Sequence, residues 1–503
     1  MDNNVYNEVQ TTYIPQTVEK VREKPEYSRA ETVLSAIVFI AAFCVMRYVV
    51  FNAMGFITTG VFTAIITAAV VYMKKKGCSF SKFNRFHAAV LYIFSFVFSI
   101  TANSFIKDLA ALFILGAGAY LVYSVSAENR EVERYLPFAM CKALFEYPFS
   151  HFGKQAAITQ DQLSKSKAGS NVKYIIIGLI ITVPVTAIVA ALLMSADDRL
   201  MNMLANIYES IFSAKMCDII GQLLLAVPLS MYLFGMLYAN THRSLIDPLS
   251  EQGCIQKLFS IRFVSNLVMY TAVTPLCILY VMFFISQANY FLSAFSGSLP
   301  DGFTYADYAR KGFFELCAVA VINLAVLCCI SLFSKKAGRE KPAALKVYSV
   351  VLSVFTLILI ATAMSKMVMY ISNYGLTELR VYTSWFMVLL ALVFVLIIIK
   401  QFRFDMKFAK YFSAVFTLMF AVLCFSRPEA VIAKYNIVMY NSGHLAELDK
   451  DAILEMSADG LLAAYNEGEV TAEDILEYSE EYCSFDTFGN YNLSSAVLGS
   501  KTK

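Results

Sequence analysis

The chain has 503 residues, of which 58% are hydrophobic and only 16% are charged. Charged residues make up about 25% of an ordinary soluble domain, so this composition excludes a soluble globular protein and indicates an integral membrane protein. The formal net charge of +3 hides an asymmetry between basic loops and an acidic C-terminal segment, which is described below.

Residues 1–31 contain Pro15, Pro25 and many charged side chains, and they precede the first apolar segment. Low hydrophobicity and high charge prevent a segment from burying enough apolar surface to fold alone. We therefore expect a mobile cytoplasmic arm.

Eleven apolar segments follow, and each approaches the roughly 20 residues that a transmembrane helix needs. The third is short and is compatible with a tilted or partly re-entrant helix. The first four form a membrane region over 32–125, and the other seven form the main bundle over 172–426. The expected fold is an all-α, polytopic transmembrane helix bundle of about 11 spans, at 32–54, 56–73, 87–101, 108–125, 172–194, 216–239, 262–289, 312–334, 344–371, 378–400 and 408–426.

A loop at 126–171 separates the two groups of spans. Within it, the run from Arg134 to Phe149 places Phe138, Leu144 and Phe145 between charged residues. This mixture is typical of a helix that lies in the membrane interface, with its apolar face toward the lipid. We expect such a helix on the cytoplasmic surface.

Residues 427–503 carry 14 acidic and 5 basic side chains. Pro428 is suited to the first position of a helix, and Gly443 is suited to its end. Thr471 and Asp474 have the spacing of a capping box. The segment is therefore expected to be a small helical extracytoplasmic domain, with loose residues from Ser484 onward.

The distribution of Lys and Arg predicts the orientation. With a cytoplasmic N-terminus, the inner segments hold 28 of the 41 basic residues and the outer segments hold 11, while Arg47 and Lys366 lie within spans. Basic residues concentrate in cytoplasmic loops. We expect a plasma-membrane protein with a cytoplasmic N-terminus and an extracytoplasmic C-terminus.

The sequence contains no phosphate-binding loop, zinc-protease motif, Cys-x-x-Cys pair, nucleophile elbow or dinucleotide fingerprint. Its four histidines are scattered over different loops. We therefore expect no catalytic residue, no cofactor and no metal site. The basic clusters flank the spans, so contact with membrane lipid headgroups explains them better than binding to nucleic acid.

Ionisable residues at membrane depth are the strongest functional signal, because a charge in hydrocarbon needs a partner or water. Lys366 is expected to form a buried pair with Glu315. The competing interpretation is snorkelling at the interface, with structural pairs such as Lys311 and Glu315. The functional interpretation is a polar site open to the outside, with ten candidate residues: Arg47, Arg310, Lys311, Glu315, Lys366, Tyr374, Glu378, Arg380, Asn436 and Tyr440.

Part of this candidate site has a local structural interpretation. Gly375 is suited to a tight outer loop, and Thr377 is suited to cap the helix that carries Glu378 and Arg380. Asn436 and Tyr440 share one face of the helix that follows Pro428. We expect this helix to dock on the outer ends of the spans near Tyr374.

Four strings carry a resemblance to a family. The sequence is similar to bacterial polytopic membrane proteins, common in Firmicutes, that contain an uncharacterised domain of unknown function. The resemblance extends over about 173–461 and implies no substrate, cofactor or catalytic residue. The strings are LLMSADDRL at 192–200, YARKGFFELC at 308–317, YGLTELRVYTSWFM at 374–387 and RPEAVIAKYNIVMYNSGHLAELDKDAILEMSADGL at 427–461.

Three classes of function fit the sequence. The first is a non-enzymatic sensor, scaffold or assembly factor whose outer acidic domain meets a protein partner. The second is a secondary transporter or permeation protein with an outward-facing polar vestibule, in which prolines such as Pro184, Pro228 and Pro275 break helices. The third is a membrane-embedded enzyme on a lipid-linked substrate, with Asp197, Asp198 or Glu315 as acid or base. The sequence does not identify a small-molecule ligand for any of these three classes.

Overall fold

The computed structural model describes residues 27–126, 135–165, 214–242, 251–286, 313–335, 342–403, 405–482 and 491–501, with single positions at 182, 186 and 189. The described residues form helices and connecting loops, and their only β pairing is an isolated bridge between Val264 and Ser334. The expected all-α fold is therefore confirmed. The expected arm at 1–31 lies almost entirely outside the described residues.

Ten of the described helices are long and apolar enough to cross a membrane. The predicted span at 172–194 falls outside the described residues, apart from the single positions 182, 186 and 189. The predicted short segment at 87–101 is a full-length span over Lys82–Ile100 instead. It begins earlier than its apolar core because Asn84 is buried and His87 bonds to the carbonyl of Ala117 at 3.0 Å.

The first group of spans surrounds one apolar core. Phe62, Phe94, Phe98 and Phe234 are among its largest fully buried side chains. The group consists of α1 (Arg29–Val45), which continues as a π-helical turn (Met46–Val50), α2 (Phe56–Lys75), α3 (Lys82–Ser95), α4 (Val97–Ile100), α5 (Ser104–Ser126) and α11 (Ala214–Thr241).

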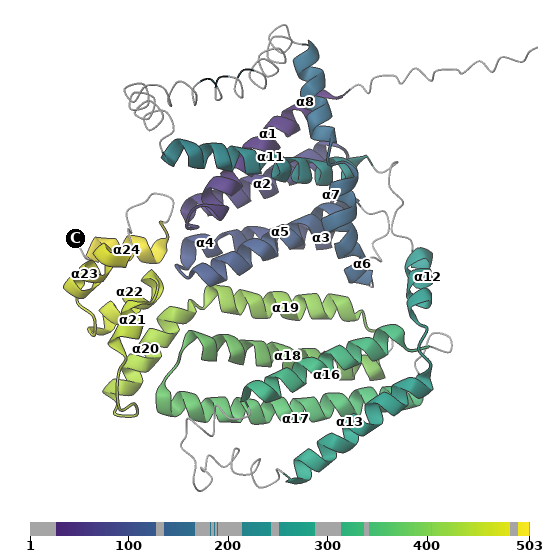
Figure 1. Ribbon diagram of the computed structural model, residues 1–503, viewed down its shortest axis with the longest axis vertical. Helices are drawn as coiled ribbons and strands as arrows, with labels where there is room; N and C mark the ends of the chain where they lie inside the picture. The colour runs from purple at the N-terminus through teal and green to yellow at the C-terminus, as the bar shows by residue number, and fades with distance from the viewer. Residues whose placement is uncertain are drawn as a thin grey trace, which may run out of the picture.

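The second group has a separate core around Phe313, Leu352 and Phe394. It consists of α13 (Asn266–Ser286), α16 (Phe313–Phe333), α17 (Ala343–Tyr374) and α18 (Glu378–Phe402). A further helix, α19 (Phe408–Phe425), lies between the groups and packs Phe420 into the first core (Figure 1). The bundle thus has two cores joined through α19.

The two ends of the bundle differ. The C-terminal domain covers one end, and the loops at 76–81 and 262–265 and the residues 403 and 405–407 lie at the opposite end (Figure 1). Basic residues concentrate in and beside these loops. The acidic domain and the basic loops are therefore separated by the length of the spans.

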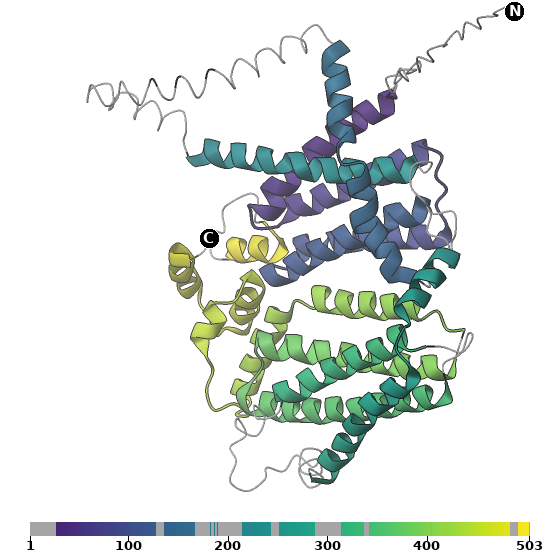
Figure 2. The ribbon, with the colours of Figure 1, turned by 45° about the vertical axis from the view of Figure 1, so that its right-hand side comes forward.

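The segment from 135 to 165 runs across the direction of the spans, as Figure 2 shows. Tyr147 packs edge-on against Tyr123, with ring centroids 5.4 Å apart, whereas Phe145 and Phe149 are exposed. These contacts suit a helix that lies along a membrane surface. The segment contains α6 (Leu136–Cys141), a π-helical turn (Lys142–Glu146), α7 (Tyr147–Ser150) and α8 (Lys154–Lys165), and α12 (Glu251–Ile261) lies nearby.

The C-terminal domain has a third core, to which Ile437, Leu461, Ile475 and Leu498 contribute. Its helices are α20 (Pro428–Asn441), α21 (Lys450–Leu454), α22 (Ala458–Glu467), α23 (Ala472–Tyr482) and α24 (Leu493–Lys501).

Two sequence expectations about this domain have opposite outcomes. The capping box is confirmed, because Thr471 and Asp474 exchange hydrogen bonds at 2.7 to 3.2 Å. The expectation of loose residues after Ser484 is wrong for 493–501. That segment is helical because Leu498 enters the core, and the peptide N–H of Phe56 donates to the carbonyl of Tyr491 at 2.8 Å.

Candidate functional site

Asp459 lies at the centre of the junction between the C-terminal domain and the bundle. Ser457 caps α22, so Asp459 occupies the first turn of that helix, where a carboxylate is favoured. One carboxylate oxygen accepts from the hydroxyl of Thr101 at 2.6 Å and from the peptide N–H of Ala102 at 2.8 Å. The other accepts from the hydroxyl of Ser494 and from Arg427. This buried carboxylate therefore joins the domain to the loop between α4 and α5.

Arg427 provides a positive charge at the junction and connects α19 to α20. It has φ of 50°, and it is the only non-glycine residue with positive φ in the described chain. Its Nε donates to Asp459 at 2.9 Å, and another guanidinium nitrogen donates to Ser494 at 2.7 Å. A left-handed conformation costs a side-chain-bearing residue about 1 kcal/mol, so the ion pair offsets local strain.

A second carboxylate, Glu429, is buried in the first turn of α20 with 5% of its surface exposed. Its Oε2 accepts from the peptide N–H of Ser457 at 2.9 Å and from the Ser457 hydroxyl. Its Oε1 accepts from the side-chain amide of Asn103 at 2.5 Å, and the same amide nitrogen donates to Glu378 at 2.9 Å. Asn103 thus bridges carboxylates of α18 and α20.

The electrostatic surroundings of Glu429 are unusual. Its burial, together with hydrogen bonding to Glu378, raises the pKa of Glu429 to about 7. Lys107 of α5 is also buried and donates to the carbonyl of Met54 at 2.5 Å. The ammonium group of Lys107 interacts electrostatically with both Asp459 and Glu429.

Asn436 fixes the middle of α20 to the loop between α17 and α18. Its side-chain oxygen accepts from the peptide N–H of Leu376 at 2.6 Å, and its amide donates to the Leu376 carbonyl at 2.9 Å. The loop approaches closely because Gly375 has φ of 72° and has no side chain. A Cβ atom at position 375 would lie 2.5 Å from the Asn436 oxygen.

Arg380 stabilises the same loop from the side of the bundle. It donates to the carbonyls of Tyr374 and Gly375 at 2.9 and 2.5 Å, and its guanidinium lies 4.0 Å from the ring centroid of Tyr370. Cationic side chains near the end of a helix satisfy its last carbonyls. The expected cap by Thr377 is confirmed, since its side chain accepts from the peptide N–H of Arg380.

The structure brings together four of the ten candidate residues: Tyr374, Glu378, Arg380 and Asn436. Two further candidates, Tyr440 and Arg47, lie elsewhere in the described structure. Tyr440 is exposed further along α20. Arg47 lies over the ring of Tyr48 in the π-helical turn. Positions 310 and 311 fall outside the described residues.

The expected pair of Glu315 and Lys366 is placed differently from the prediction. Glu315 is close enough to act electrostatically on Lys366. Its side chain is exposed at the start of α16, whereas Lys366 is half-buried in α17. The prediction that both partners are buried is wrong, because the first turn of α16 leaves Glu315 at the surface of the bundle.

Sequence analysis missed most of the junction: Asn103, Lys107, Arg427, Glu429 and Asp459. Arg427 and Asp459 both lie in the last string of the family resemblance, 32 positions apart, and that string was the available signal. The sequence contained no comparable signal for Asn103 and Lys107. An asparagine in a short loop and a lysine at a span end are ordinary in a membrane protein, and only the tertiary structure shows that both are buried.

The helices and this buried junction define a polytopic helical membrane protein with a docked C-terminal domain. Within that class, the chain belongs to the family described as Domain of unknown function (DUF4153), whose model matches residues 88–467. The match extends from α3 to the end of α22 and so includes both sides of the junction. No curated protein and no solved structure matches the chain. A bacterial origin stays a prediction.

The hydrogen bonds of the junction join several elements to one another, and its buried carboxyl groups are suited to binding protons. Within the described ranges, no group of three or more His, Cys, Asp or Glu side chains is placed to bind a metal ion. The carboxylates of Asp459 and Glu429 are engaged by hydrogen-bond donors from several elements. Of the candidate acids and bases for an enzyme, Asp197 and Asp198 lie outside the described residues.

Proposed function

We propose that this protein is a non-enzymatic scaffold of the plasma membrane whose extracytoplasmic C-terminal domain is held in a fixed orientation for a protein partner. One observation carries the proposal. Asp459, Glu429 and Asn436 bind the domain to the loop between α4 and α5 and to the loop between α17 and α18. A domain that only needed a tether would not require buried polar contacts with two separate loops.

The orientation is part of this proposal. The basic loops lie at the end of the bundle opposite the acidic domain (Figure 1). Because basic loops are retained in the cytoplasm, this separation supports an extracytoplasmic domain.

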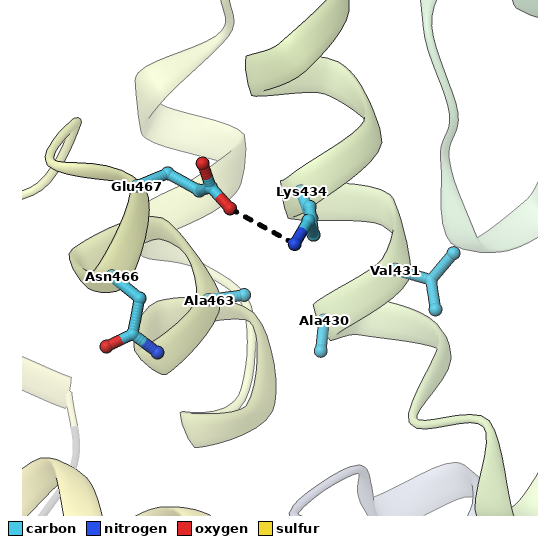
Figure 3. A pocket seen from close by; sticks show the side chains of 6 residues that line it. All are labelled: Ala430, Val431, Lys434, Ala463, Asn466 and Glu467. Carbon is cyan, nitrogen blue, oxygen red and sulfur yellow. Dashed lines mark ion pairs between the residues drawn. The ribbon is translucent and has the colours of Figure 1, made fainter.

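The partner is proposed to bind the exposed face of α20 and the neighbouring groove between α20 and α22. The groove has a volume of about 270 Å³, and Lys434 and Glu467 point toward one another across it, 3.4 Å apart (Figure 3). On the exposed face of α20, Val431 and Val438 are 49% and 47% exposed. Exposed apolar side chains at helical spacing beside a groove are typical of a surface that accepts a partner helix.

The mid-bundle polar residues favour a scaffold over a transporter. Tyr280 donates to Asn323 at 2.6 Å, and Asn323 donates to Thr356 at 2.9 Å. These three residues join α13, α16 and α17 to one another. Hydrogen bonds between spans stabilise helix packing in membranes, so these groups are engaged in packing.

Site-specific photo-crosslinking in intact cells tests the proposal. A photoreactive residue at position 434 or 438 should give one discrete crosslinked species. The matched control is position 451 of α21, which is exposed on the same domain. Equal crosslinking at all three positions, or none at 434 and 438, would contradict a partner-binding face. Solute flux that depends on the protein in liposomes would favour the transporter instead.

A further inference from the structure

Glu378 and Glu429 meet at the domain junction, where a carboxylate oxygen of each lies 2.9 and 2.5 Å from the same side-chain nitrogen of Asn103. The side-chain amide of Asn103 donates one hydrogen to each of them. One amide group cannot neutralise two negative charges. Glu429 is buried and Glu378 is partly buried, and two neighbouring carboxylates resist full ionisation because like charges repel. The arrangement therefore favours one retained proton.

The charges around the pair support the same conclusion. Lys107 of α5 acts on Glu429 and on Asp459 of α22, and Arg427 is paired with Asp459. Arg380 of α18 is bonded to backbone carbonyls. Asp108 of α5 is exposed, and Tyr382 of α18 is an uncharged neighbour of both glutamates. The cations of Lys107 and Arg427 balance Asp459 and one glutamate, which leaves the second glutamate to be neutralised by a proton.

We propose that a proton held between Glu378 and Glu429 locks the C-terminal domain onto the bundle, and that loss of this proton releases the domain. This proton-dependent latch between the C-terminal domain and the bundle goes beyond the proposed scaffold function. Its biological consequence rests on the proposal that the C-terminal domain binds a protein partner. The ligand of this site is the proton itself.

The direction of the pH dependence follows from the docked geometry. In the docked state the pKa of Glu429 is raised to about 7, whereas a glutamate in water has a pKa of about 4.3. The docked state therefore binds the proton more tightly than the released state. The contribution of this proton to docking is complete below about pH 4.3, weakens as the pH rises, and is lost above about pH 7. Between about pH 5 and pH 8 the docking equilibrium should fall by at most about a hundredfold.

Distance measurement between two spin labels tests the latch in the full-length protein in lipid nanodiscs. The labels are placed at Ser372 of α17 and at Glu455, which directly follows α21, in a background with the native cysteines replaced. Both positions are exposed and lie outside the polar junction. The wild-type distance distribution should be narrow near pH 5 and should gain a broad second population near pH 8. Glu429→Gln mimics the protonated acid and should stay narrow at both pH values.

Two further variants make the result decisive. Glu378→Gln neutralises the other member of the pair and should behave like Glu429→Gln, so it covers the case in which one variant fails to fold. Glu447→Gln alters an exposed carboxylate of the same domain and should keep the wild-type response. An unchanged wild-type distribution, or a pH response that persists in Glu429→Gln, would overturn the latch. Because the labels report docking without any partner, either result leaves the photo-crosslinking test independent.

Discussion

The carboxylate of Asp459 accepts a hydrogen bond from the hydroxyl of Thr101 at 2.6 Å, across 358 positions of sequence. Thr101 ends one span, and Asp459 begins a helix of the C-terminal domain. Their contact closes the chain on itself, so the final domain is part of the folded bundle. The predictions below depend on this closure.

Asp459→Asn should destabilise the protein and loosen its C-terminal domain. The variant removes the negative partner of Arg427 and one of the anions that act on Lys107. Removing one member of a buried ion pair costs about 3 to 5 kcal/mol. Because Arg427 is partly exposed, we expect the lower end of this range. The melting temperature in detergent should fall, and limited proteolysis should cleave between α19 and α22.

The matched control is Asp451→Asn, which changes an exposed aspartate in α21 of the same domain. Surface substitutions usually stay within about 0.5 kcal/mol. Similar losses for the two variants would show that the Asp459 contacts do not hold the junction.

Gly375→Ala should weaken the docking of α20 through two effects. Its φ of 72° disfavours any residue with a side chain, and the added Cβ would lie 2.5 Å from the Asn436 oxygen. Gly443→Ala is the control, since Gly443 has φ of 74° but has open space where an alanine Cβ would lie. We expect about 1 kcal/mol for the control from backbone strain and about 1 to 3 kcal/mol more for Gly375→Ala from the clash.

Thermal unfolding of both glycine variants measures this difference. In an Asn436→Ala background the clash is relieved, so the extra cost of Gly375→Ala should shrink toward that of Gly443→Ala. Independent, additive losses would refute the close approach of α20 to this loop.

Lys366→Met and Glu315→Gln should show weak coupling in a double-mutant cycle. Glu315 acts electrostatically on Lys366 but is exposed. Exposed pairs are worth about 0.2 to 1 kcal/mol, so we expect coupling in this range from melting temperatures in detergent. A coupling energy above about 3 kcal/mol would show that the pair is buried in the membrane after all.

Topology reporters should place the two ends of the bundle on opposite sides of the membrane. A reporter that is active only in the cytoplasm should work when fused after Lys76 and fail after Lys503. The reason is the excess of 28 basic residues on the expected inner side over 11 on the outer side. Activity after Lys503 would reverse the proposed side of the C-terminal domain.

Much of the secondary structure followed from the sequence alone, because it depends on local chemistry. Apolar runs must satisfy their backbone hydrogen bonds internally in lipid, so they form helices. Pro428, Thr377 and the Thr471 capping box marked helix starts correctly, because each acts within a few residues. The excess of acidic residues after position 427 likewise separated the last domain from the spans.

The junction was decided only by the tertiary structure. Asn436 and Glu378 were expected near each other because a short tether after α19 limits where α20 can lie. Asn103, Glu429 and Asp459 could not be assigned in this way, since the polar groups that satisfy them come from segments more than 300 positions apart as well as from near neighbours. A carboxylate has the same local sequence signature whether it meets water or a buried amide. Its partner, and with it the proton that it holds, exists only once the domain has docked.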